Sequence, residues 1–260
     1  MNNKHKNLLW TIILVIALIV IVASVCVISL NYFSGEHNEK FLKQHSGTTT
    51  SHESELTDSL PLADNPIDFS SLEEINTDIY AWINIPGTDV DYPIVQAGKG
   101  YDDFFYLSHN IEKNYEFAGS IYSEKQNARD FSDPVTVLYG HNMKNGTMFA
   151  SLHKFSDASF FNKHEYMYVY LRGRKLTYKI YAAYEYDDRH ILNSFDFDNP
   201  EIVQSYFDST LQPATMNCNV RNGISLSETD RILTLSTCTD DNKNARFLVQ
   251  GVLYKDEPTK

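Results

Sequence analysis

The strongest constraint on the fold is a series of short segments rich in β-branched and aromatic residues, separated by Gly, Asn, Asp and Pro. Between residues 90 and 254 the sequence contains seven of them: VDYPIVQ, AGSIYSE, PVTVLYG, EYMYVYL, KLTYKIYAAYEY, RILTLST and RFLVQGVLY. Short strands separated by turn residues are typical of an all-β barrel or sandwich. The sequence therefore predicts a mainly β domain.

Three other segments have helical character. MFASLHKFSDASFF and NPEIVQSYFDSTL lie between the predicted strands, and we expect them to be inserted helices. DFSSLEEINTDIYAWI, at residues 68–83, precedes the first strand. Ser70 and Ser71 are each followed three residues later by Glu, which predicts a capped helix with Ile79 on its apolar face.

The N-terminal region contains an uncharged apolar stretch at residues 8–30. A helix of that length spans roughly 35 Å, which exceeds the bilayer core of about 30 Å. Lys4 and Lys6 precede it and the next charge is Glu36, so the positive-inside rule places the N-terminus in the cytoplasm. A cleaved signal peptide is an alternative, and so is a lipoprotein signal ending at Cys26, but bulky Val25 and the lack of a small-residue cleavage site favour an uncleaved anchor.

This interpretation divides the chain into four parts. Residues 1–7 are a cytoplasmic tail, residues 8–30 a single transmembrane helix, residues 31–67 an extracellular stalk, and residues 68–260 the catalytic domain. The stalk is rich in Ser, Thr, Glu, Asp and His, a composition that buries little apolar surface.

The part after the anchor has 20 basic and 34 acidic residues. This excess of negative charge argues against nucleic acid as a partner.

Three residues at predicted strand ends form a candidate reactive set. Cys238 ends an apolar strand, His141 follows another after Gly140, and Arg246 begins a third. A thiol with a pKa near 8.5 is mostly protonated at neutral pH, and a neighbouring imidazolium lowers that pKa. The imidazole can later protonate a leaving amine, and a guanidinium can bind the oxygen that becomes negative during acyl transfer. The set is suited to acyl transfer.

The same motifs resemble a known family. TLSTC, followed eight residues after its Cys by RFLVQG, resembles the signature of sortases, and LYGHNMKNGTMF resembles their histidine strand. WINIPGTDVDYPIVQ, GSIY and the long segment between residues 184 and 231 are similar to class B sortases. The resemblance implies a closed eight-stranded β-barrel and cysteine transpeptidation by His141, Cys238 and Arg246, without a cofactor or a metal.

The resemblance also implies the substrates. A sortase cleaves a C-terminal sorting signal of the LPxTG or NPxTN kind after its Thr and holds the acyl group as a thioester. It passes this group to an amine of a peptidoglycan precursor or to a pilin lysine. The implied location is the cell membrane, with a single-pass anchor and an extracellular catalytic domain.

Several alternatives remain open in the sequence. Asp240 is either a support for His141 or Arg246 or an exposed loop carboxylate. Ser236 shares a strand face with Cys238 by the period of two and is a second candidate for support. Cys218 is expected to be packing, with a bridge to Cys238 as the alternative. The rival functions are a pilin-polymerising sortase, a cysteine protease that transfers its acyl group to water, and a non-catalytic surface binding module.

Overall fold

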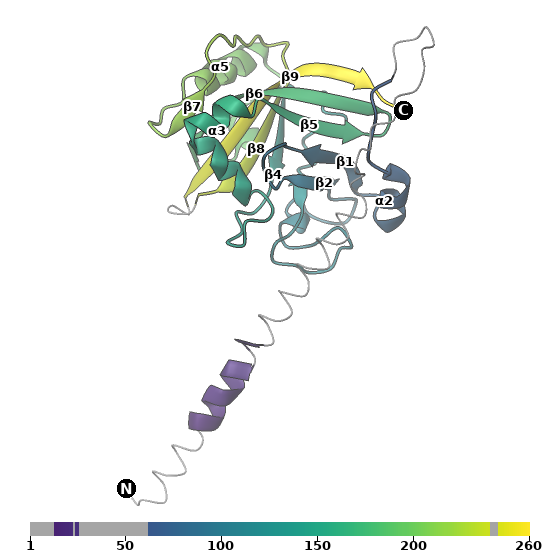
Figure 1. Ribbon diagram of the computed structural model, residues 1–260, viewed down its shortest axis with the longest axis vertical. Helices are drawn as coiled ribbons and strands as arrows, with labels where there is room; N and C mark the ends of the chain where they lie inside the picture. Colours follow the sequence, from purple (N-terminus) through teal and green to yellow (C-terminus); the bar gives the residue numbers. More distant parts are fainter. Residues whose placement is uncertain (1–12, 23, 26–61, 240–243) are drawn as a thin grey trace, which may run out of the picture. The chain divides into compact units, whose positions relative to one another are not determined.

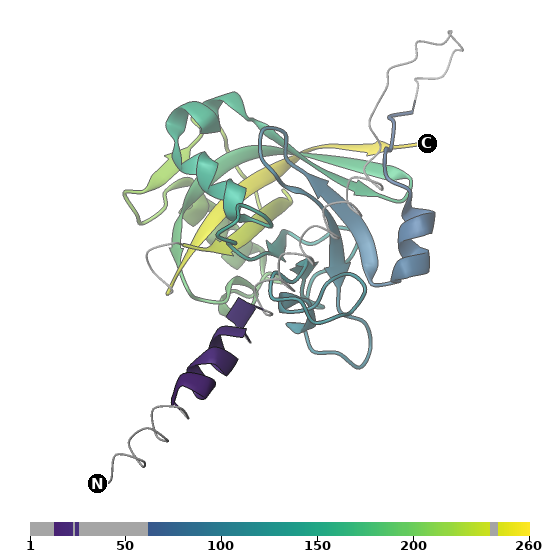
Figure 2. The same ribbon diagram turned by 60° about the horizontal axis from the view of Figure 1, so that its bottom comes forward.

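Eight strands of the computed structural model close into a barrel, in the order β5-β1-β2-β3-β4-β8-β9-β6 with β6 paired back to β5 (Figures 1 and 2). This confirms the predicted eight-stranded barrel. The barrel strands are β1 (Ile79–Asn84), β2 (Asp91–Gln96), β3 (Ile121–Ser123), β4 (Val135–Tyr139), β5 (Tyr166–Leu171), β6 (Arg174–Asp187), β8 (Ile232–Cys238) and β9 (Ala245–Pro258). A short additional strand, β7 (Cys218–Val220), pairs with β6.

The structure describes residues 13–22, 24–25, 62–239 and 244–260. The chain forms two compact units, Met1–Gln44 and His45–Lys260. In the predicted anchor, residues 13–22 and 24–25 are helical, whereas the remainder of residues 8–30 lies outside the described residues. Over the described ranges, none of the helices combines the length and the hydropathy needed to cross a bilayer.

Strand alternation gives β8 and β9 two apolar faces. Leu233, Leu235 and Val249 point into the central cluster shared by the barrel strands. Ile232 and Leu248 point to the other face, where α5 (Pro200–Leu211) covers them in a second cluster. Because successive side chains alternate between faces, the residues of the outer face continue along β8 to Cys238 at its end. The position of the candidate thiol outside the barrel core follows from this pattern.

The helix predicted at residues 68–83 is shorter than expected. It is α2 (Phe69–Ile75), and its cap is Asp68, whose side chain accepts from the backbone N–H groups of Ser70 and Ser71. The following segment, predicted as its continuation, is instead strand β1, paired with β2 and β5. Its isoleucine, tyrosine and tryptophan side chains fit a pleated, buried surface, so strand pairing overrode the helical spacing.

The two inserted helical segments are present. The first divides into a 3-10 helix, η2 (Ala150–Ser156), and α3 (Ala158–Lys163), because Asp157 caps α3 by accepting from the N–H of Phe160. The second is α5, which begins with Pro at its first turn behind an Asn199 cap. Two short helices, η1 (Phe105–Leu107) and α4 (Ile191–Ser194), were not predicted.

Candidate active site

Three strand ends meet at one edge of the barrel. Strands β4 and β8 are parallel neighbours, with Tyr139 aligned to Ser236, so their carboxyl ends lie together. Continuing that register by two residues brings His141 level with Cys238. Strand β9 is antiparallel to β8 and begins at the same edge, where Arg246 is aligned with Cys238. The sheet topology therefore brings together three residues that the sequence places up to 105 positions apart.

Cys238 and Arg246 form a close cross-strand pair. The N–H of Thr239 donates to the carbonyl of Ala245 at 3.4 Å, so the Cys238–Arg246 pair itself is of the non-hydrogen-bonded kind. In such pairs the Cα atoms approach to about 4.5 Å and the side chains stand on the same face. The thiol of Cys238 is exposed and the side chain of Arg246 is half-buried. The eight-residue spacing seen in the sequence is the spacing of a hairpin that opposes these two residues.

His141 is held by the loop between β2 and β3. Its Nε2 lies 2.8 Å from the carbonyl oxygen of Leu107, and its ring stacks on Phe117 with 5.6 Å between centroids. When the imidazole is neutral, donation by Nε2 leaves the Nδ1 lone pair as the acceptor. Gly140 is required immediately before it, because a Cβ there would approach a methyl group of Ile121 to 2.5 Å and the ring of Phe149 to 2.8 Å.

The three residues line a single pocket of about 300 Å³. Ser236 lines it too, on the same face as Cys238, as the strand period predicts. Asp240, the other candidate for support, lies outside the described residues. The rest of the pocket lining comes from residues that the sequence did not indicate.

That part of the lining contains a largely buried hydrogen bond between His190 and Glu124. Nε2 of His190 lies 2.6 Å from a carboxylate oxygen of Glu124, whose side chain is 3% exposed. The other ring nitrogen of His190 accepts from the N–H of Asn193, which fixes Nε2 as the donor to the carboxylate. The pair ties the end of β3 to the start of α4, and both residues line the pocket. Sequence reasoning missed it because 66 residues separate the partners and neither has a local motif.

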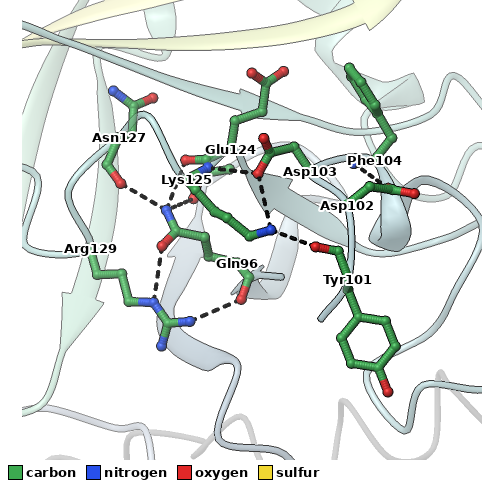
Figure 3. A network of polar contacts seen from close by, with 10 residues as sticks. Gln96, Tyr101, Asp102, Asp103, Phe104, Glu124, Lys125, Asn127 and Arg129 are labelled. Carbon is green, nitrogen blue, oxygen red and sulfur yellow. Dashed lines mark hydrogen bonds and ion pairs between the residues drawn. The ribbon is translucent and has the colours of Figure 1, made fainter. Parts of the chain in front are cut away.

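Glu124 is positioned in turn by a polar network around Gln96 (Figure 3). The Gln96 side-chain amide donates to the backbone carbonyls of Glu124 and Asn127, both at 2.8 Å. Arg129 donates to the side-chain and main-chain oxygens of Gln96. Lys125 bonds the carbonyl of Tyr101, on the segment that leads into the pocket-lining residue Phe104. These contacts hold the backbone at Glu124 and the segment before Phe104, two parts of the pocket lining.

Tyrosines complete the lining of the pocket. Burial raises the pKa of Tyr122, the charge of Glu124 raises it further, and the nearby Arg246 partly offsets the rise. Burial also raises the pKa of Tyr186, against the opposing charge of Arg189. Both phenols therefore stay neutral in the working pH range and can donate hydrogen bonds. The hydroxyl of Tyr186 is buried and has no hydrogen-bond partner among the residues that the structure describes.

Cys218 differs from the expectation that it is packing. It begins β7, opposite Tyr184 of β6, and its side chain is exposed. A strand of three residues at the edge of β6 does not have the neighbours needed to bury it. Cys218 and Cys238 are both free thiols, so no disulfide joins them.

Comparison with known proteins identifies the family. A family model described as the sortase domain matches residues 83–254. The chain belongs to the sortase family. Sortase B of Listeria monocytogenes is 30% identical to it, over 96% of this chain and 98% of the relative. Sortases are cysteine transpeptidases, and this membership excludes the non-catalytic binding module as its function.

Solved structures agree with the class B assignment. The structure of Clostridium perfringens sortase B has a TM-score of 0.65 and 36% identity, covering 72% of this chain and 100% of the other. A Streptococcus pyogenes class B sortase involved in pilus biogenesis has a TM-score of 0.61 and 31% identity, covering 72% of this chain and 97% of the other. The sortase described here is thus class B-like in both sequence and fold.

Proposed function

We propose that Cys238 is the nucleophile of this transpeptidase, His141 its acid–base partner and Arg246 the donor to the substrate carbonyl. The observation that supports this assignment best is the Cys238–Arg246 pair, which opens into the same pocket as His141. A nucleophile, a proton carrier and a fixed cation around one cavity are the groups that acyl transfer requires.

The first half of the reaction is acylation. The thiolate of Cys238 attacks the Thr carbonyl carbon of the donor, and the carbonyl oxygen becomes an oxyanion. The guanidinium of Arg246, oriented by its Nη1 bond to the carbonyl of Ala245 at 3.1 Å, donates to that oxygen. The C–N bond then breaks, His141 gives its proton to the leaving amine, and a thioester remains.

The second half transfers the acyl group. An incoming amine loses a proton to His141 and attacks the thioester carbon, with Arg246 again binding the oxyanion. Collapse of this intermediate forms an amide and returns Cys238 as a thiolate. Water follows the same path and gives an acid, so the outcome depends on which nucleophile the pocket orients toward the thioester.

The donor is a protein that carries a C-terminal sorting signal of the LPxTG or NPxTN kind, cleaved after Thr. The acceptor is an amine of a cell-wall precursor or a pilin lysine. The similarity to a class B sortase involved in pilus biogenesis supports the pilin lysine as an acceptor. The buried Tyr186 hydroxyl supports a polar ligand in the pocket, because a donor without a partner is satisfied when a peptide carbonyl reaches it.

The enzyme acts outside the cell at the membrane. Residues 8–30 form a single transmembrane anchor with a cytoplasmic N-terminus, residues 31–67 form the spacer, and residues 68–260 form the catalytic domain. The uncharged 8–30 stretch and the preceding Lys4 and Lys6 support this topology. A chain beginning near Asn31 should stay in the soluble fraction, whereas the full chain should sediment with membranes. Sedimentation of both would contradict the anchor.

The fate of the acyl group tests transpeptidation against hydrolysis. The full chain is mixed with a sorting-signal peptide and increasing concentrations of triglycine or hydroxylamine, and the products are read by mass spectrometry. Oriented attack should convert the product from acid to amide as the amine rises, since orientation can offset several kcal/mol of water's concentration advantage. Free acid formed at an unchanged rate, without amide at millimolar amine, would establish the hydrolase.

A further inference from the structure

Two side chains converge on the main-chain carbonyl of Cys238. The Nδ2 of Asn142 donates to this oxygen at 3.1 Å, and the Nε2 of His153 lies 3.1 Å from it as a second donor. Asn142 follows His141 in the chain, and His153 lies in η2. Neither side chain has a part in the reaction proposed above.

The strand geometry explains why this carbonyl needs side-chain donors. On the β4 side, the N–H of Gly140 donates to the carbonyl of Ser236 at 3.2 Å. Two residues further along β8, the carbonyl of Cys238 points the same way, and its ladder partner would be the main-chain N–H of Asn142. Strand β4 has already ended at Tyr139, so the side-chain amide of Asn142 takes that place.

The antiparallel neighbour supplies no substitute. Because Cys238 and Arg246 form a non-hydrogen-bonded pair, β9 does not donate to the Cys238 carbonyl. His153 adds the second donor and also stacks its ring on Phe247, with 4.8 Å between centroids. His153 thus contacts both β8, which ends at Cys238, and β9, which contains Arg246.

We propose that Asn142 and His153 are positioning residues that fix the Cys238 peptide unit and thereby aim its Sγ at His141 and the substrate carbonyl. The inference rests on the proposed role of Cys238 as nucleophile. Cys238 is the last residue of β8 and its side chain is exposed, so packing does not fix the thiol. On the β9 side its peptide unit is held by the Thr239 N–H at 3.4 Å from the Ala245 carbonyl, and the two side-chain donors hold the carbonyl on the other side. A displacement of about 1 Å at a reacting atom can cost about a hundredfold in rate.

The test removes each donor while keeping the shape of the side chain. Asn142→Asp replaces the amide nitrogen by an oxygen, and His153→Phe retains the ring that stacks on Phe247. In the full chain, each variant should lower kcat on a sorting-signal peptide several-fold, and the double variant about a hundredfold, with KM nearly unchanged. His153→Gln, which presents an amide nitrogen in place of Nε2, should restore most of the kcat lost in His153→Phe.

Two matched controls receive the same substitutions far from the pocket. His164→Phe changes a histidine that also stacks on a phenylalanine, Phe160, at 4.1 Å. Asn65→Asp changes an amide that also donates to a backbone carbonyl, that of Leu171, at 2.8 Å. Both controls should keep kcat. The melting temperature and the pH dependence of Cys238 alkylation by iodoacetamide, read by peptide mass, are measured in all variants.

The results separate positioning from structural support. A lower kcat with an unchanged melting temperature and an altered alkylation profile supports the proposal. A double variant with kcat within twofold of wild type overturns it, and so does a loss of kcat that merely follows a loss of folded protein. Cys238→Ala is assayed in parallel. If that variant stays active, the proposed nucleophile is wrong. If it is inactive and the double variant is normal, only the positioning role fails.

Discussion

The two ends of strand β9 use arginine in opposite ways. Near its carboxyl end, Asp256 accepts from Arg174 of β6 at 2.6 Å and from Arg231, next to β8, at 3.3 Å, so carboxylate and guanidinium groups neutralise one another. At its amino end, Arg246 is set opposite a thiol and faces a pocket. The first arrangement joins three neighbouring strands, whereas the second places a guanidinium in the pocket where we propose that the substrate carbonyl binds. Under that proposal, stability and chemistry are separated along one strand.

Changes at the amino-end pocket should abolish activity and leave the fold intact. Cys238→Ala removes the covalent route, and His141→Ala removes the proton carrier, so each should lower kcat/KM on a sorting-signal peptide at least about a thousandfold. Circular dichroism should show an unchanged melting temperature. If Cys238→Ala loses less than about a thousandfold in activity, another residue is the nucleophile. The functional difference between the two ends of β9 would then not hold.

Arg246→Lys should have the next largest effect. A lysine keeps the charge but not the planar, fixed fork that holds an oxyanion, so kcat should fall about a hundredfold. Arg174→Lys, a matched change in β6 beside the carboxyl end of β9, should leave kcat unchanged. Equal losses in the two variants would mean that the two ends do not differ in function.

Asp256→Asn should change stability and not activity. The hydrogen bond from Arg174 holds the pKa of Asp256 below its usual range, with Arg231 contributing in the same direction. A carboxylate whose pKa is depressed by folding stabilises the fold above the unfolded-state pKa of about 3.9, and this contribution is lost as pH falls through the lower folded-state value.

At neutral pH, loss of this partly exposed network should lower the melting temperature by about 2–4 °C, the shift that corresponds to about 1 kcal/mol in a domain of this size. Below pH 4 the difference between Asp256→Asn and wild type should shrink. Thermal melts between pH 3 and pH 7 measure it, and a difference that grows toward low pH would contradict the assignment.

Cys218→Ser should have the smallest effect. Both described thiols are exposed, but only Cys238 lies opposite an arginine in the pocket. The serine variant should keep its activity with or without reductant. An iodoacetamide titration read by peptide mass should modify Cys238 first at neutral pH, because only the Cys238 thiol shares a pocket with His141 and Arg246 among the described thiols. Faster modification of Cys218 would argue that the pocket does not activate its thiol.

The sequence predicted the features that depend on local pattern. The alternation of RILTLSTC and the eight-residue spacing to Arg246 predicted two strands that bring Cys238 and Arg246 to one edge, and the observed register confirms this placement. Strand β1 was assigned to a helix because its apolar residues also fit helical spacing, and only its pairing with β2 and β5 decides between the two.

The supporting contacts were not predictable from the sequence. Glu124 and His190, or Asn142 and the Cys238 carbonyl, are 66 and 96 residues apart, and each contact depends on where strands from different parts of the chain end. A single histidine or asparagine in a loop carries no sign of its partner. The resemblance to sortases predicted the candidate reacting residues, but it did not extend to the groups that contact them.

The parallel pairing of β4 with β8 has a consequence for the order in which the enzyme matures. The register aligns Val135 with Ile232, so 97 residues must be arranged before the two strands join. Closing so long a loop is entropically costly, and non-local parallel pairings form slowly. The barrel hairpins can therefore assemble while His141 and Cys238 are still apart. Reactivity of the thiol should then appear in the last phase of refolding. Recovery of activity would therefore show that β4 and β8 have paired.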